Sequence, residues 1–438
     1  MQLTRSKLFA ASCTLLGVPA VHADQSDWSA DSALTYYHES DGRITAVEPV
    51  VKLKGGFGNE RTLDVKLTYD SLSGATPNGA IPSTRTQTFA SPSGTSLNPV
   101  VQTYTTASGQ SISERSTVYS IAPGQLPMDP NYSDQRFAIN ANWQQPLSRL
   151  THLSVGGDLS YEHDFLSTSL NTTLSHDFNQ KNTTLSLAVN GEYDSVQPIG
   201  GAPVAGSDYS RFQKNGDESK LDVNVMLGLT QIMTRRWIAD VNISSDRMTG
   251  YLNDPYKIIS IVDDTGNVTG YLYEKRPQSR TRNSIFWENH IALDDSTIST
   301  SVRHMTDNWG IHSDTLQLNW RLFNGDHDGY IEPQLRWYRQ SAANFYVPWL
   351  SNNISYVDAA SADSRLGALH ALTFGLKYAF KTRGDFDSPS KGNEYAIRAE
   401  FYQQTPDQKM PGPGVLQGLN LYPGLKAFLI QFEWKFSN

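Results

Sequence analysis

The chain has 438 residues, a formal net charge of −8 and 38% hydrophobic residues. Its acidic balance argues against a nucleic-acid partner, and no run of about twenty apolar residues beyond the N-terminus could form a membrane helix. A chain of this length could form two or three soluble domains or one large closed sheet. A membrane barrel is compatible with the low hydrophobicity, because its strands alternate apolar and polar residues.

The first element is a predicted secretory signal peptide over residues 1–23. Arg5 and Lys7 precede the apolar stretch LFAASCTLLGVPA, and a small-x-small cleavage pattern ends at residue 23. The one cysteine of the chain, Cys13, falls inside this segment, so the mature chain from Asp24 has no disulfide and no thiolate metal site. The alternative is a lipoprotein signal in which Cys13 carries the lipid.

Amphipathic strands follow along the rest of the chain. In TLDVKLTYD, apolar Leu63, Val65 and Leu67 alternate with Asp64 and Lys66, which places the two sets on opposite faces of a strand. About sixteen such segments have the length of tilted membrane strands. They start near Ala30, Arg43, Glu60, Tyr132, Leu150, Leu166, Asn182, Glu218, Trp237, Ser279, Ser296, Ser313, Gly329, Ser364, Gly392 and Gly424.

The length of each connection depends on whether the strand before it is odd-numbered or even-numbered. Long irregular connections follow only odd-numbered strands, whereas connections after even-numbered strands are mostly tight turns. The long ones are 72–131, 196–217, 250–278, 342–363 and 405–423. Alternate hairpins of an up-and-down barrel emerge on opposite sides, so all long loops share one rim.

We therefore predict an all-β fold in which residues 24–438 form one transmembrane, up-and-down antiparallel β-barrel of about sixteen strands. The long loops are extracellular, the short turns are periplasmic, and the barrel lies in the lipid of a bacterial outer membrane. The alternative is a large soluble β-sandwich or propeller.

The last strand, LKAFLIQFEWKF, alternates large apolar residues with Gln431, Glu433 and Lys435. Its aromatic end, Trp434 and Phe436, is predicted to face lipid and to serve as the signal that the barrel-assembly machinery reads. Two residues follow Phe436, whereas the familiar signal ends on the aromatic residue itself.

Several segments at the bases of predicted loops resemble one bacterial family. They are SGATPNGA at Ser73–Ala80, GYLNDPYK at Gly250–Lys257 with Arg276 and Pro277, and SRLGA at Ser364–Ala368. Together they look like the family catalogued as domain of unknown function 3570. The resemblance implies an outer-membrane β-barrel without an assigned activity, and it supplies no catalytic residue. It also implies a link to a redox-related envelope system with a periplasmic or lipoprotein partner.

If apolar positions face lipid, the alternate positions face the lumen, and their charges are predicted to form two opposed walls. An acidic wall comprises Asp158, Glu162, Glu192, Asp194, Asp222 and Asp240. A basic wall comprises Arg282, Arg303, Arg321, Arg336 and Arg398. Such a transverse field orients polar solutes and filters ions. The alternative is that these charges simply pair with strand neighbours.

The long outer loop, 72–131, is the largest irregular segment of the chain. Its composition is rich in Ser, Thr, Gly, Pro and Asn, with few charges. We predict that it folds over or into the lumen as a constriction or plug, because loops of this length in compact domains usually have a function. The alternative is a mobile surface loop.

No catalytic constellation is evident, and we expect neither an enzyme nor a metal or cofactor site. The histidines are scattered without a spacing that singles out a base or ligand. Asn253, Asp254, Pro255 and Tyr256 form a polar turn flanked by aromatic residues, and we predict that this loop-base motif binds a ligand or docks the long loop.

Two functions fit this sequence. The first is a porin-like channel or transporter for ions or small polar solutes. The second is a barrel sealed by its own loops that serves an envelope system as a structural or interaction protein.

Overall fold

The computed structural model describes residues 28–91, 99–105, 111–130, 132–211, 213–325, 328–352, 358–382, 393–407 and 411–437. The predicted signal peptide, 1–23, lies outside these residues. Within them no helix has the length and apolar content needed to cross a membrane.

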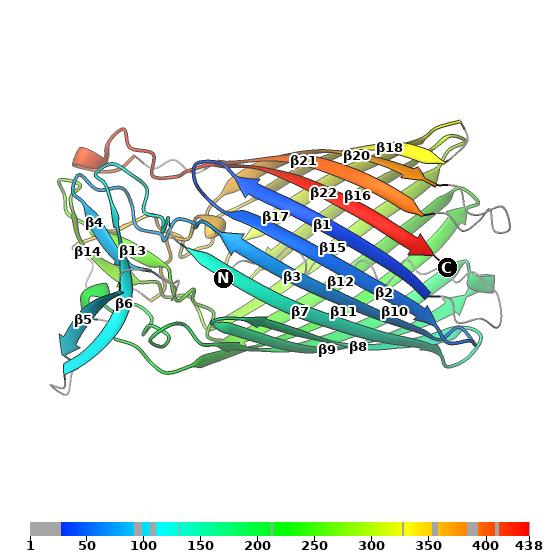
Figure 1. Ribbon diagram of the computed structural model, residues 1–438, viewed down its shortest axis with the longest axis horizontal. Helices are drawn as coiled ribbons and strands as arrows, with labels where there is room; N and C mark the ends of the chain where they lie inside the picture. Colours follow the sequence, from blue (N-terminus) through cyan, green and yellow to red (C-terminus); the bar gives the residue numbers. More distant parts are fainter. Residues whose placement is uncertain are drawn as a thin grey trace.

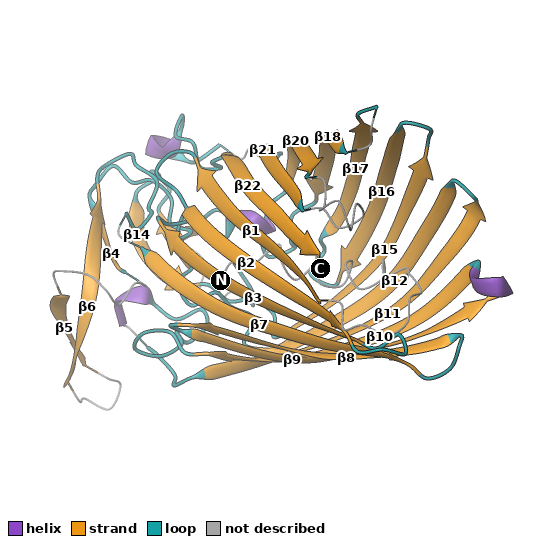
Figure 2. Cartoon of the chain, turned by 45° about the vertical axis from the view of Figure 1, so that its right-hand side comes forward, coloured by secondary structure: helices purple, strands orange, loops and turns teal. Residues whose placement is uncertain are grey.

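Sixteen antiparallel strands close into one barrel (Figures 1 and 2). In order around the barrel they are β1 (Trp28–Glu39), β2 (Thr45–Gly56), β3 (Thr62–Ser73), β7 (Ser133–Pro146), β8 (Thr151–Glu162), β9 (Phe165–Phe178), β10 (Thr183–Val196), β11 (Glu218–Thr234), β12 (Trp237–Gly250), β15 (Ser279–Ala292), β16 (Ser296–Asp307), β17 (His312–Phe323), β18 (Gly329–Gln340), β20 (Leu369–Lys381), β21 (Glu394–Pro406) and β22 (Leu425–Ser437). The predicted up-and-down barrel of about sixteen strands is thereby confirmed, and the β-sandwich and the propeller are excluded.

Closure of the barrel joins its first strand to its last. β22 pairs with β1, with Phe436 opposite Ala30 and Phe428 opposite His38. The side-chain amide of Gln431 also donates to Thr35 Oγ1 at 3.1 Å across this seam. No edge of the barrel is left unpaired, as a strand in lipid requires.

Strand alternation separates an apolar outer surface from a polar interior, as in β11. Leu221, Val225 and Leu227 are exposed on the outside, with 47%, 41% and 58% of their surface accessible, while Asp222 and Asn224 line the interior cavity. Apolar side chains that are exposed in this way are stable only against lipid, because a soluble barrel would bury them.

The two rims of the barrel differ. At the outer rim the long connections carry two small sheets, one of β4 (Gln87–Ala90), β6 (Ser111–Ile121) and β5 (Pro99–Thr105), the other of β14 (Val268–Tyr273), β13 (Ile258–Val262) and β19 (Leu350–Ser351). Three short 3-10 turns also lie in the outer connections, η2 (Tyr209–Arg211), η3 (Ser364–Leu366) and η4 (Gly414–Leu416), whereas η1 (Asn179–Lys181) joins β9 to β10 at the inner rim. At the inner rim the described connections are short turns, and β22 ends there (Figure 1). The predicted asymmetry of loops is confirmed.

The apolar core of the molecule lies mainly in these outer connections and not inside the barrel. One cluster packs Phe89 and Tyr119 of the long loop against Ile258 and Tyr273 of β13 and β14. The rings of Phe89 and Tyr119 are 5.7 Å apart and tilted, a favourable aromatic geometry. The connections at the outer rim therefore form a packed cap above the barrel.

One predicted strand start is displaced. The fourteenth strand was expected from Ser364, but the structure has η3 at this position and β20 begins at Leu369. Asp363 caps the turn by accepting a hydrogen bond from the backbone N–H of Arg365 at 3.1 Å. A side-chain cap of this kind competes with strand pairing, and the alternation in the sequence does not reveal it.

Candidate functional site

A cavity of about 1900 Å³ occupies the barrel interior. Its lining includes residues of the outer cap, such as Tyr119 and Tyr209, and residues at the inner rim, such as Lys54 and Gln144. Most of the strands contribute inward-facing polar or charged side chains to it. The cavity therefore extends along the barrel from the cap to the periplasmic ends of the strands.

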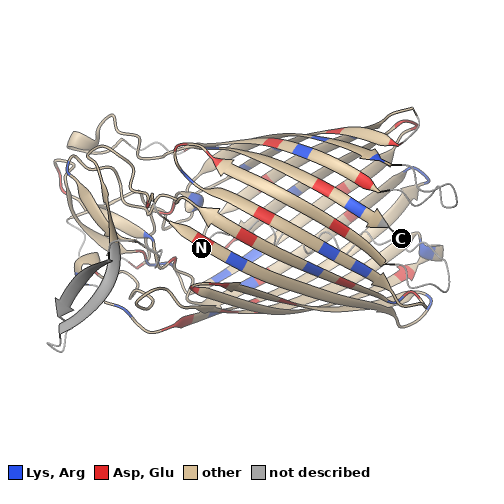
Figure 3. Ribbon diagram, in the orientation of Figure 1, with Lys and Arg blue, Asp and Glu red and all other residues tan. Residues whose placement is uncertain are grey.

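Figure 3 shows acidic and basic residues interspersed along the strands. The structure adds Lys52, Lys66 and Arg136, on β2, β3 and β7, to the charges that line the cavity. The predicted two-wall arrangement did not include them, although their strands also have alternating patterns. The lumen therefore has basic groups on more than one arc.

Four of the predicted acidic residues line the cavity: Asp158, Glu162, Glu192 and Asp222. Asp158 accepts hydrogen bonds from Ser169 and Asn171 of β9, at 2.7 and 3.4 Å. These contacts hold the carboxylate of Asp158 close to the neighbouring strand β9.

The other two acidic residues are buried in pairs with neighbouring strands. Asp194 forms an ion pair with Lys220 of β11 at 2.9 Å, and their strand positions are directly opposite. Asp240 accepts a hydrogen bond from Thr230 at 2.5 Å. These two residues follow the alternative of local pairing.

The predicted basic residues divide in the same way. Arg282, Arg303 and Arg336 line the cavity in the outer half of β15, β16 and β18. Arg321 pairs with Glu332 at 2.7 Å and Arg398 with Glu400 at 3.4 Å, and neither arginine is among the described residues that line the cavity.

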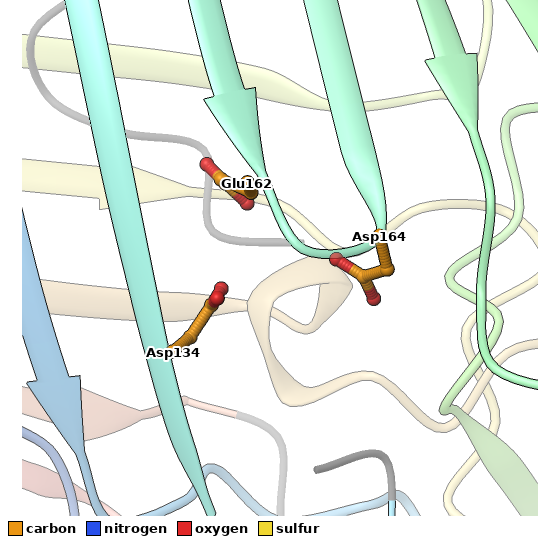
Figure 4. Close-up of side chains that lie close together, drawn as sticks. All are labelled: Asp134, Glu162 and Asp164. Atoms are coloured by element: carbon orange, nitrogen blue, oxygen red, sulfur yellow. The ribbon is translucent and has the colours of Figure 1, made fainter. Parts of the chain in front are cut away.

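Three carboxylates from β7, β8 and the turn between β8 and β9 lie close together (Figure 4). Asp134, Glu162 and Asp164 each present an oxygen within 4.8 Å of the others. Tyr256 donates its hydroxyl hydrogen to Asp164, and Arg136 forms an ion pair with Asp70 nearby in the same wall. Carboxylate oxygens of this spacing are the kind of donors that hard cations use. The alternation of single strands does not reveal this group, because its members come from two strands and the turn between β8 and β9.

The predicted loop-base motif belongs to a larger buried ionic network. We call it the loop-base network, and its members are Asp254, Lys257, Glu274, Arg276, Asp363 and Arg365. Three carboxylates thus meet three cations where the cap joins the barrel. Asp254, Lys257, Glu274 and Asp363 are each at most 5% exposed.

The contacts of this network connect segments that are far apart in the sequence. Arg365 pairs with Asp254 at 2.9 Å, and Arg276 pairs with Asp363 at 2.9 Å and with Glu274 at 2.8 Å. The backbone N–H of Arg276 donates to Asn253 Oδ1 at 2.7 Å. The motif residues therefore act as connections between loops.

The long outer loop joins the same network at its base. Lys257 donates to Thr76 Oγ1 at 3.2 Å and to the carbonyl oxygen of Pro77, and the backbone N–H of Ile258 donates to the carbonyl of Asn78 at 2.9 Å. Ala75, Thr76 and Asn78 also line the cavity. The base of loop 72–131 thus lies at the lumen, while β5 and β6 extend away from the barrel (Figure 1).

Burial and charge act in opposite directions within the network. Burial alone would raise the pKa of Asp363, but Arg365, Lys257 and Arg276 hold it well below its usual value. Burial lowers the pKa of Lys257 and raises the pKa of Glu274. Removal of one member would leave a buried charge without its compensation.

The three segments that carried the family resemblance, Ser73–Ala80, Gly250–Lys257 and Ser364–Ala368, all contribute to this network or to its immediate hydrogen bonds. From the sequence, Ser73–Ala80 belongs to the predicted plug and Gly250–Lys257 to the loop-base motif, whereas no functional role is predicted for Ser364–Ala368. The roles of Glu274, Asp363 and Arg365 were missed, because nothing in the sequence shows which loop bases meet.

A family model described as "Protein of unknown function (DUF3570)" matches residues 5–436. No match is found among curated proteins.

Among solved structures the chain is similar to several proteins of Pseudomonas aeruginosa, one of which is described as the outer membrane protein opdK. It matches OccK5 (OpdH) with a TM-score of 0.42 and 9% identity over 96% of this chain and 100% of that one. It matches OccD3 (OpdP) with a TM-score of 0.41 and 8% identity over 95% and 92%. The barrel assignment rests on the strand pairing itself.

Proposed function

The chain belongs to the DUF3570 family, and starting from this membership we propose that it is a porin-like channel of the outer membrane for ions and small polar solutes. The observation that carries the proposal is the cavity of about 1900 Å³, whose lining reaches from the cap to the inner rim. A sixteen-stranded barrel is wide enough to leave an aqueous lumen.

The chemistry of the lining also supports passage of polar solutes. Asp158, Glu192, Asp222, Arg303 and Arg336 face this cavity from different strands. Charged side chains in a lumen retain water and interact with solutes at several weak sites, which passage requires. An apolar ligand store would need an apolar interior instead.

The test is single-channel conductance of the refolded mature chain, residues 24–438, in a planar bilayer. We expect stable steps that increase with salt concentration. A silent protein whose heat-modifiable migration and circular dichroism show a folded barrel would refute the channel.

A second function is supported by the loop-base network. Ion pairs join Asp254 to Arg365 and Arg276 to Asp363 between connections at the outer rim, and both carboxylates are buried. A cap held in this way suits a sealed barrel that serves as a structural or interaction protein for an envelope system. A folded but silent barrel that copurifies with a periplasmic protein or lipoprotein would favour this second function.

A further inference from the structure

Three guanidinium groups lie near one another on the inner wall formed by β15, β16 and β18. We call Arg282, Arg303 and Arg336 the guanidinium cluster. All three line the cavity, and Arg303 experiences the positive charge of both other members. Like charges in one part of a wall repel each other, so such an arrangement requires compensation.

Compensation from the protein is uneven within the cluster. Arg282 forms an ion pair with Asp246 of β12, whose position is directly opposite in the strand register. The charged groups that act on Arg303 are Arg336 and Arg282 alone, and no carboxylate within the described chain is among them.

Arg303 also has unused hydrogen-bonding capacity. Its Nε atom is buried and has no hydrogen-bond partner among the described residues. The guanidinium carbon lies 5.8 Å from the ring centre of Phe286, which holds one face of the group at the wall. A buried polar group in this state is costly unless a ligand or water satisfies it.

The strand register places two more polar side chains beside Arg303. Thr315 of β17 is directly opposite Arg303, and Tyr338 of β18 is directly opposite Thr315. Both side chains line the cavity. The Thr315 hydroxyl thus accompanies the guanidinium groups on this part of the wall, whereas the Tyr338 hydroxyl already donates to Gln340 Oε1 at 2.6 Å.

We propose that the guanidinium cluster is a binding site for an oxyanion, the carboxylate or phosphate group of a small solute inside the lumen. The inference rests on the proposed channel for the route by which the solute arrives, and the binding itself does not require conduction. The fork of donors on a guanidinium matches two oxygens of a carboxylate or phosphate, and Arg303 has no carboxylate partner within the described chain.

The first test measures binding without transport. Refolded full-length mature protein in detergent is titrated by calorimetry with succinate and, separately, with inorganic phosphate at low ionic strength. We expect saturable binding of at least one probe, at least tenfold weaker in Arg303→Gln and retained in part in Arg303→Lys. Binding of succinate alone would identify a carboxylate site, and binding of phosphate alone a phosphate site.

The matched control is Arg339→Gln. Arg339 lies on β18 three residues from Arg336, but its side chain is exposed on the outer surface of the barrel. We expect the affinity of this variant to equal that of the wild type. Equal affinities in wild type, Arg303→Gln and Arg336→Gln, or no saturable binding of either probe, would overturn the proposal.

The second test uses reversal potentials in a salt gradient. In the double variant Arg303→Gln, Arg336→Gln we expect the ratio of chloride to potassium permeability to fall at least twofold. A silent barrel that still binds succinate or phosphate would refute the channel and keep the oxyanion site. A conducting barrel with unchanged selectivity and no binding would keep the channel and refute the site. If either glutamine variant fails to fold, Arg303→Lys carries the comparison.

Discussion

The loop-base network offers the sharpest test of how the cap is held, through the substitution Arg365→Met. The Arg365 guanidinium donates to Asp254 at 2.9 Å and to Asp363 at 2.5 Å. Methionine retains much of the side-chain volume but leaves both carboxylates without this partner. Asp254 and Asp363 are 4% and 3% exposed, so water cannot readily replace it.

The expected cost is about 3–5 kcal/mol, which is typical when one partner of a buried ion pair is removed. Because each 1.4 kcal/mol changes an equilibrium constant about tenfold, local opening of the cap should become roughly a hundred to a few thousand times more frequent. The barrel strands should keep their stability, since the backbone hydrogen bonds between them do not involve the Arg365 side chain, and Gln340 of β18 contacts only the backbone carbonyl of Arg365.

Hydrogen exchange measures this opening directly. The backbone N–H of Ile258 donates to Asn78 and that of Glu274 to Lys257, so both amides report on contacts within the base of the cap. They should exchange faster in Arg365→Met, while amides of the barrel strands serve as an internal reference.

The control substitution is Arg211→Met. Arg211 is exposed and pairs with Asp208 at 3.7 Å, so its loss should cost at most about 1 kcal/mol. Unchanged exchange at Ile258 and Glu274 in Arg365→Met would show that the network does not hold the cap, and equal effects of the two substitutions would show that its burial is unimportant.

Three further predictions concern the same region. The ends of the segment 84–123 are adjacent, because the backbone N–H of Gly124 donates to the carbonyl of Ser83 at 2.7 Å. Replacement of this segment by a short Gly-Ser linker should therefore preserve the barrel and raise the single-channel conductance. An unchanged conductance would mean that this segment does not restrict the path. Gly79→Ala should destabilise the cap by about 1–3 kcal/mol, visible as faster exchange, because φ is +96° and a Cβ atom would lie 2.3 Å from a backbone oxygen; wild-type exchange rates would contradict this. The folded-state pKa of Asp363 is depressed, so this carboxylate stabilises the fold fully above its unfolded pKa, near 3.9, and the contribution is lost only as pH falls through the folded value. Protection of the cap amides from hydrogen exchange should therefore persist from pH 7 to about pH 4. A loss of protection near pH 6 would refute the depressed pKa of Asp363.

The barrel could be predicted because alternation is a local property of the sequence. Each strand needs only its own residues to show an apolar and a polar face, as Leu221 and Asp222 do in β11. The displaced start of β20 marks the limit of this signal, since the cap that Asp363 provides depends on one side-chain hydrogen bond.

The site could be predicted only in part, because its contacts are not local. Arg365 and Asp254 are 111 residues apart, and Lys257 and Pro77 are 180 apart. Alternation indicates that Arg321 and Arg303 both face inward, but only the strand register reveals that Arg321 meets Glu332. Inward orientation can therefore be predicted before the strands are paired, whereas charge compensation cannot.

The pairing of β22 with β1 has a consequence for how this protein can form. It joins residues almost 400 positions apart, as Gln431 and Thr35 show. Among the strand pairs of the barrel, this one therefore has the greatest sequence separation, and contacts of that kind form slowly. A chain that lacks β22 would not be a slightly smaller barrel, since β21 and β1 would both become unpaired edges with no water in the bilayer to satisfy them. Insertion and closure are therefore expected to be one cooperative event, in which a partly synthesised or truncated chain gains little of the stability of the whole.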